Sequence, residues 1–359
     1  GGPGRPAARA GAIDVVSLTV AGDFLVLFNN SAIDSWIRHI KNIRSITFIG
    51  VPGEEGLFRR NMGIHYPHLQ VVDNNASLGS HDDGESPPPI RFVNQTHFKE
   101  KYMDGHKMPC PYWKVCQQLM KLHVFELRSD LGMDLLNDVL IVDSDTVWSR
   151  NVTFVNSTDG MATYFEVEGM ARADCGDHPL AFTEAITSGP PPPNLTGEQI
   201  AAHVANTTLS PYRTCVGPGR KGVITGSGGK GLSHITHHML FQYDVMMGLH
   251  NAVNTAWNTT SFWRASNVCF YGHGRCSGRV AEYELYYSYA VAQHPERVRK
   301  EVLRQGVDFM VGSAICEQKE MECCRSKNVL LKGCHDHRIS GWRANPKAVG
   351  DMCCPYNPS

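Results

Sequence analysis

The chain lacks three features that would each indicate a different class of protein. No run of about 18 apolar residues occurs, so no segment is expected to span a membrane. Neither sign of charge dominates, because 34 Lys and Arg residues oppose 35 Asp and Glu residues. Strong attraction to nucleic acid or to a charged membrane surface is therefore not expected, and we expect no nucleic-acid partner. No signal peptide is visible at the start.

The beginning of the chain reads as a linker. Residues 1–11 are rich in Gly, Pro and Ala, which predicts a loose stem remnant. The hypothesis is a luminal domain released from a type II membrane parent, with contact to the membrane only through a missing N-terminal anchor. The remaining length suits one large catalytic domain over residues 12–315, followed by a cysteine-rich extension over 316–359 that packs on it.

Cysteine is abundant, and its number is even. The twelve cysteines are Cys110, Cys116, Cys175, Cys215, Cys269, Cys276, Cys316, Cys323, Cys324, Cys334, Cys353 and Cys354. Cys323-Cys324 and Cys353-Cys354 are adjacent pairs rather than Cys-x-x-Cys, which argues against a zinc ribbon. The pattern favours disulfides formed in an oxidising compartment, with a connectivity that the sequence does not determine.

N-glycosylation sequons indicate the same compartment. Eight Asn-x-Ser/Thr sequons begin at Asn29, Asn75, Asn94, Asn151, Asn156, Asn194, Asn206 and Asn258, against about two expected by chance. We predict an N-glycosylated protein of the secretory pathway, in the Golgi or ER lumen. Asn151 and Asn156 follow a predicted buried strand closely, so they are expected to be the least used.

The order of predicted elements indicates an α/β fold. Strands are expected over 13–20, 45–50, 138–142, 161–167 and 307–311, and helices over 35–44, 111–127, 196–204, 241–253 and 279–303. The β-α-β order at the start predicts parallel strands joined by a right-handed crossover. Polar loops are expected over 74–91 and 184–197, and the tail from Cys316 is expected to be loop-like.

Two carboxylates leave the end of one predicted strand. Asp143-Ser144-Asp145 follows the apolar run Val139–Val142. In α/β folds, ligands bind at the carboxyl ends of the strands. Carboxylate oxygens suit Mn²⁺ or Mg²⁺, and these ions also accept diphosphate oxygens. The alternative is a turn that only closes a strand.

Three later segments carry further candidates. His237 and His238 are adjacent, so at most one faces a given site; either could bind metal or a diphosphate, or both could be ordinary buried histidines. Glu282 and Glu284 lie among tyrosines on a predicted helix, where they could steer a sugar hydroxyl or simply face solvent. His337, in the tail, could be a metal ligand or part of a disulfide-anchored loop.

The glycine-rich segment 226–231 does not fit a phosphate-binding motif. Lys230 precedes Gly231, and no Ser or Thr follows a Gly-Lys pair at the place a P-loop requires. The segment also lacks the helix opening of a dinucleotide-binding fingerprint. A substrate loop is the favoured interpretation.

These segments together resemble a known family. The block from Lys121 to Leu127 and then from Asp138 to Val147 resembles the donor site of GT-A-type glycosyltransferases, including the glycogenin-like branch. The segments Thr236–Met239 and Glu282–Tyr286 resemble a poorly characterised GT-A-like family with Thr-His-His-Met and Ser-Glu-Tyr-Glu-Leu-Tyr blocks, with Ala281 replacing the Ser. The resemblance runs from about residue 13 to 311 and does not cover the tail.

The resemblance implies a GT-A-type, Rossmann-like mixed sheet flanked by helices, a nucleotide-sugar donor and usually Mn²⁺. It implies that Asp145 binds the metal, that Asp143 contacts the ribose or the metal, and that Lys121 approaches the donor. The glycogenin-like branch takes another ligand from a His-x-x-Gly-x-x-Lys-Pro-Trp segment. His337 with Gly341-Trp342 departs from that spacing and lacks Lys-Pro, so His237 and His238 remain rivals for this role.

The resulting hypothesis is a metal-dependent glycosyltransferase. It would move a sugar, expected from a UDP-sugar, to a hydroxyl of a protein or glycan acceptor. Glu282, Glu284 and His237 are the catalytic candidates; Asp143, Asp145, Lys121 and His238 are the cofactor-binding candidates; Asp143, Asp145 and His337 are the metal candidates. The alternatives are a secreted binding protein with the same fold and no turnover, and a metal-dependent hydrolase or nucleotidyltransferase. The sequence does not decide between retention and inversion.

Overall fold

The computed structural model describes a large part of the chain. The described residues are 10–20, 23–24, 27–28, 32–73, 86–96, 113–126, 128, 133–168, 183, 186–190, 196, 199, 202, 232–233, 236–266, 281–304, 308–312 and 331–334. Most of the helix predicted over 196–204, the loop over 226–231 and His337 lie outside this set, and the set describes the backbone but not the side chains of Cys116 and Cys334.

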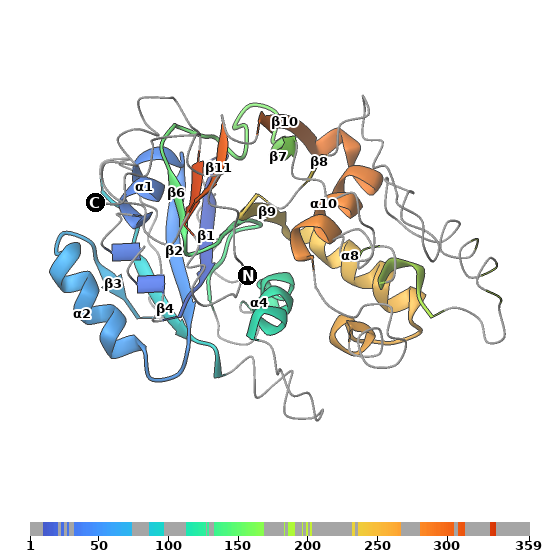
Figure 1. Ribbon diagram of the computed structural model, residues 1–359, viewed down its shortest axis with the longest axis horizontal. Helices are drawn as coiled ribbons and strands as arrows, with labels where there is room; N and C mark the ends of the chain where they lie inside the picture. The colour runs from blue at the N-terminus through green and yellow to red at the C-terminus, as the bar shows by residue number, and fades with distance from the viewer. Residues whose placement is uncertain are drawn as a thin grey trace, which may run out of the picture.

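A six-stranded sheet forms the centre of the molecule (Figure 1). In spatial order its strands are β3 (Val71–Val72), β4 (Ile90–Asn94), β2 (Ile43–Gly50), β1 (Ile13–Leu18), β5 (Asp138–Val142) and β9 (His238–Gln242). All neighbours pair in parallel except β9, which runs antiparallel to β5. The predicted mixed α/β sheet is therefore confirmed, and β1 and β2 are parallel as expected.

Helices flank this sheet. They are α1 (Ala32–His39), α2 (Glu55–His65), α4 (Trp113–Leu122), α8 (Tyr243–Ala256) and α10 (Glu282–Gln293). The last three contact one another or the β9 side of the sheet, whereas α2 contacts β4 near the other edge (Figure 1). None of the described helices is long and apolar enough to cross a membrane.

Two smaller sheets complete the described part. The strands of one are β10 (Val298–Arg304), β7 (Ala162–Glu168) and β8 (Leu232–Ser233), in that order. The strands of the other are β11 (Phe309–Gly312), β12 (Leu331–Cys334) and β6 (Thr146–Trp148). Strand β12 belongs to the tail and pairs with β6, which directly follows the Asp-x-Asp segment.

The structure corrects three predicted elements. The helix expected over 279–303 ends at Gln293, because Pro295 opens a short 3-10 turn, Pro295–Arg297, that leads into β10. The helix expected from residue 241 starts at Tyr243, because the preceding five residues pair with β5. The tail, expected to be loop-like, contains β12.

Candidate active site

The Asp-x-Asp segment lies where the sequence places it, at the carboxyl end of β5. Residues 139–142 are completely buried, so the chain reaches solvent only as the strand ends. Asp143 accepts a backbone hydrogen bond from Thr146 (3.0 Å) and donates one to the carbonyl of His237 (2.8 Å). These bonds hold both aspartates in one turn beside the start of β9.

His237 is brought to this turn by strand pairing. Val142 lies opposite His238 in the β5–β9 register, so His237 lies level with Asp143. His237 has a φ of 61°, in the left-handed region that non-glycine residues seldom adopt. Such strain persists where the surroundings over-determine it, and it is concentrated at functional sites.

Three potential metal ligands converge here. The Nδ1 atom of His237 lies 3.2 Å from Asp143 Oδ2 and 4.0 Å from Asp145 Oδ1. One ligand atom from each of the three residues lies within 4.8 Å of the others. Two carboxylates and one imidazole suit Mn²⁺, and with more retained water also Mg²⁺. The donor set therefore fits the metal that the sequence implied, with His237 as its third member.

Lys121 joins the aspartate turn to helix α10. Its Nζ atom lies 2.6 Å from Asp143 Oδ1 and 2.7 Å from Glu282 Oε1. The hydroxyl of Tyr283 donates to the same Asp143 oxygen at 2.7 Å and accepts from Lys121 at 3.1 Å. The Oδ1 atom of Asp143 thus contacts Lys121 and Tyr283, and its Oδ2 atom faces His237.

These contacts fix the charges of the network. Burial alone lowers the pKa of Lys121, but the charges of Asp143 and Glu282 outweigh it and raise that pKa above its ordinary value. Burial raises the pKa of Asp143, but Lys121 and His237 outweigh it and hold that pKa well below its usual range. Asp143 is therefore a carboxylate at any physiological pH, as a metal ligand must be.

Glu282 is buried, and burial raises its pKa against the opposing effect of Lys121. Glu284, also buried, accepts a hydrogen bond from Ser288 (3.3 Å) on the same helix. The structure brings Glu282 to the aspartates through Lys121. The hydrogen bond described for Glu284 stays within α10.

His238 points into a different environment from His237. It is 1% exposed, and its ring lies against those of Trp148, Phe154 and Phe165. Its Nδ1 atom is 2.7 Å from the carbonyl of Thr236, and burial lowers its pKa to about 3. These contacts favour a core histidine over a cofactor ligand, so of the two adjacent histidines His237 is the site candidate.

Sequence reasoning missed Asp23. Its carboxylate accepts hydrogen bonds from the hydroxyl of Ser144 (2.5 Å) and the backbone of Val20 (3.2 Å). Burial raises its pKa to about 6, and the negative charges of Asp145 and Asp143 act in the same direction. The available signal was position, because β1 lies parallel to β5 and an acid soon after β1 reaches the same edge.

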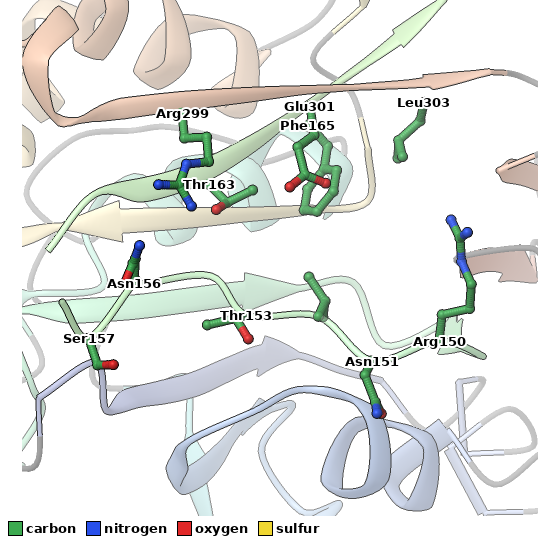
Figure 2. A pocket seen from close by; sticks show the side chains of 11 residues that line it. Arg150, Asn151, Thr153, Asn156, Ser157, Thr163, Phe165, Arg299, Glu301 and Leu303 are labelled. Atoms are coloured by element: carbon green, nitrogen blue, oxygen red, sulfur yellow. The ribbon is translucent and has the colours of Figure 1, made fainter. Parts of the chain in front are cut away.

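A polar cavity of about 530 Å³ lies apart from the aspartate turn. Figure 2 shows it between β7 and β10 on one side and the segment after β6 on the other. Its lining includes Arg150, Arg299 and Glu301, together with the sequon residues Asn151 and Asn156. Asn151 is exposed, so burial is not a reason to expect this sequon to be unused.

Comparison with known proteins yields structural neighbours only. No protein-family model matches the chain, and no curated protein sequence matches it. The apo structure of mouse xyloside xylosyltransferase 1 is similar over 90% of this chain and 97% of its own, with 10% identity and a TM-score of 0.40. The apo structure of WbbM, a bifunctional glycosyltransferase, is similar over 92% of this chain, with 11% identity and a TM-score of 0.39.

This chain covers 47% of WbbM, about half of its length. At such scores the likeness carries no weight for the reaction.

Proposed function

We propose that the chain is a metal-dependent glycosyltransferase. It would transfer a sugar from a nucleoside-diphosphate sugar, expected to be a UDP-sugar, to a hydroxyl of a protein or glycan acceptor in the lumen of the secretory pathway. The observation that carries the proposal is the convergence of Asp143, Asp145 and His237 at the carboxyl end of β5. That edge is where α/β sheets bind nucleotides and other ligands.

The proposal gives each residue a separate task. Asp143, Asp145 and His237 would hold Mn²⁺, which offsets the charge that develops on a leaving diphosphate. Lys121 holds Asp143 in place and reduces the negative charge of the cluster. Glu282 acts on the site through Lys121, so it is a positioning residue, and Tyr283 fixes the orientation of Asp143 through its hydroxyl.

Ligand-induced thermal stabilisation tests the donor site. The melting midpoint is measured with and without Mn²⁺ across nucleoside diphosphates and their sugars. Binding to the folded state stabilises it by about 2.7 kcal/mol at a ligand concentration of 100 Kd. We expect a metal-dependent rise with one nucleotide, which Asp145→Asn abolishes and Asp159→Asn, an exposed control, retains.

A second assay separates an enzyme from a binding protein. Release of nucleoside diphosphate from the selected donor is measured with water or a mixed glycan pool as acceptor. Turnover that requires Mn²⁺ and is lost in Asp145→Asn supports a transferase. Nucleotide binding with no turnover on any acceptor would support a binding protein, and release of a monophosphate would support phosphoryl chemistry instead.

A further inference from the structure

A second cluster of metal-binding residues lies at the end of α4. His123 and Glu126 follow this helix in a turn, and His250 comes from the middle of α8. One ligand atom from each of the three lies within 4.8 Å of the others. We propose that these residues bind a zinc ion that ties α4 to α8.

The hydrogen bonds prepare the histidines for a metal. Nε2 of His250 lies 3.0 Å from the carbonyl of Leu122 and donates to it, which leaves the lone pair of the neutral ring on Nδ1. Histidines that bind metal typically donate their second ring N–H to such a carbonyl. Nδ1 of His123 donates to Glu126 Oε1 at 2.6 Å, and a zinc ion held by both atoms would take the place of this proton, which the ring can carry on Nε2 instead.

Burial favours the neutral form of both imidazoles. Burial lowers the pKa of His250 to about 4 and holds the pKa of His123 well below its ordinary value. A neutral ring is the form that binds a metal ion, so no proton has to be displaced from a charged histidine near pH 7. The cluster therefore offers two nitrogens and one carboxylate.

The surroundings suit an ion with one open coordination position. The ring of Phe262 stacks on His250 at 4.5 Å, and Trp263 lies 5.7 Å from His123. The side chain of Glu126 is 26% exposed, which gives water and a metal ion a route to the cluster. Two histidines, one glutamate and a water are an established zinc set, and nitrogen ligands favour zinc over Mg²⁺.

A zinc ion in this cluster would help to fix the position of Lys121. It lies two residues before His123, at the end of the same helix. An ion that joins this end of α4 to α8 would hold the helix from which Lys121 reaches Asp143. The zinc cluster shares no ligand with the aspartate turn, so the two sites can be tested separately.

Metal content tests the proposal directly. The full chain, with its cysteines oxidised, is loaded with zinc and gel-filtered, and bound zinc is measured by mass spectrometry together with the melting midpoint. We expect at least one zinc per chain in the wild type, because the aspartate turn also offers ligands that zinc accepts, and a fall in the midpoint on chelation. Glu126→Gln and His250→Gln are each expected to hold about one zinc per chain fewer than the wild type, and the exposed control His68→Gln to hold as much as the wild type.

Asp145→Asn separates this cluster from the proposed donor site. It is expected to retain zinc while losing the response to Mn²⁺ and nucleotide. Glu126→Gln preserves volume at a partly exposed position, so it remains informative if His250→Gln does not fold. Wild-type protein without bound zinc, a zinc content of folded Glu126→Gln equal to that of the wild type, or complete loss of zinc from Asp145→Asn would each overturn the proposal.

Discussion

At the scale of single residues, Lys121 is the side chain on which the site most depends. It is 5% exposed and lies between two carboxylates, Asp143 and Glu282. Removing one partner of a buried ion pair costs about 3–5 kcal/mol, because the charge that remains is uncompensated. Here two carboxylates would remain.

Lys121→Met is therefore expected to lower the free energy of unfolding by about 3–5 kcal/mol, as measured by urea denaturation. Adding Glu282→Gln removes one of the stranded charges and should restore part of that loss. Lys41→Met, at an exposed position, should change stability by no more than about 0.5 kcal/mol. A loss for Lys121→Met no larger than that of the control would contradict the described network.

Asp23 gives the site a pH dependence of known sign. Its folded pKa of about 6 exceeds its ordinary value of 3.8, so between these values the folded state binds more protons than the unfolded state. The contribution of Asp23 to the free energy of unfolding therefore falls as pH rises through that window. This contribution is fully lost above the folded pKa.

Asp23→Asn removes this titration, and the amide oxygen of Asn can still accept the hydrogen bonds from Ser144 and Val20. In metal-free buffer, its melting midpoint relative to wild type is expected to be higher near pH 7 than near pH 4. Differential scanning calorimetry at both pH values measures the difference. A constant offset between the two proteins would show that Asp23 does not titrate in this window.

At the scale of elements, the start of β9 illustrates what local sequence patterns cannot supply. The run Asp138–Val142 was predicted as a strand, because four apolar residues between polar ones identify it. The approach of His237 to Asp143 could not be predicted, since it depends on a β5–β9 register that joins segments about a hundred residues apart. The helix predicted over 279–303 wrongly included the residues of β10, although Pro295 is a residue at which a helix commonly ends.

A pair of variants distinguishes the effect of the left-handed backbone at His237 from the effect of its imidazole. Both His237→Gly and His237→Ala should abolish stabilisation by Mn²⁺. His237→Gly should nevertheless be more stable than His237→Ala by about 1 kcal/mol, because glycine adopts this φ without steric cost. Chemical denaturation with and without the metal measures both effects; equal stability of the pair would indicate a different backbone conformation.

At the scale of the whole molecule, the sequence predicted the α/β class and the edge that carries the site, because both follow from the order and ends of buried strands. It did not predict Asp23, because neither its segment nor its spacing resembles a motif. Disulfide pairing, luminal location and the role of His337 stay predictions.

Glycosylation tests the proposed location. Asn94, Asn151 and Asn258 are exposed, so on secretion from eukaryotic cells each should carry a glycan at a substantial fraction of molecules. Asn156 is less accessible, and its amide donates a hydrogen bond to Asp159 (3.2 Å), so lower occupancy is expected there. Peptide mass spectrometry after enzymatic deglycosylation measures each position, and unmodified Asn94, Asn151 and Asn258 would argue against passage through the secretory lumen.

The pairing of β12 with β6 limits how far the chain can be shortened from its C-terminal side. A protein that stopped at residue 315 would keep every proposed ligand of the aspartate turn and still lose the strand that lies between β6 and β11. Strands β6 and β11 would then present unpaired backbone groups, which recruit strands from neighbouring molecules. The shortened protein should self-associate at concentrations where the full chain stays dispersed, so the tail belongs to the smallest well-behaved form of the protein.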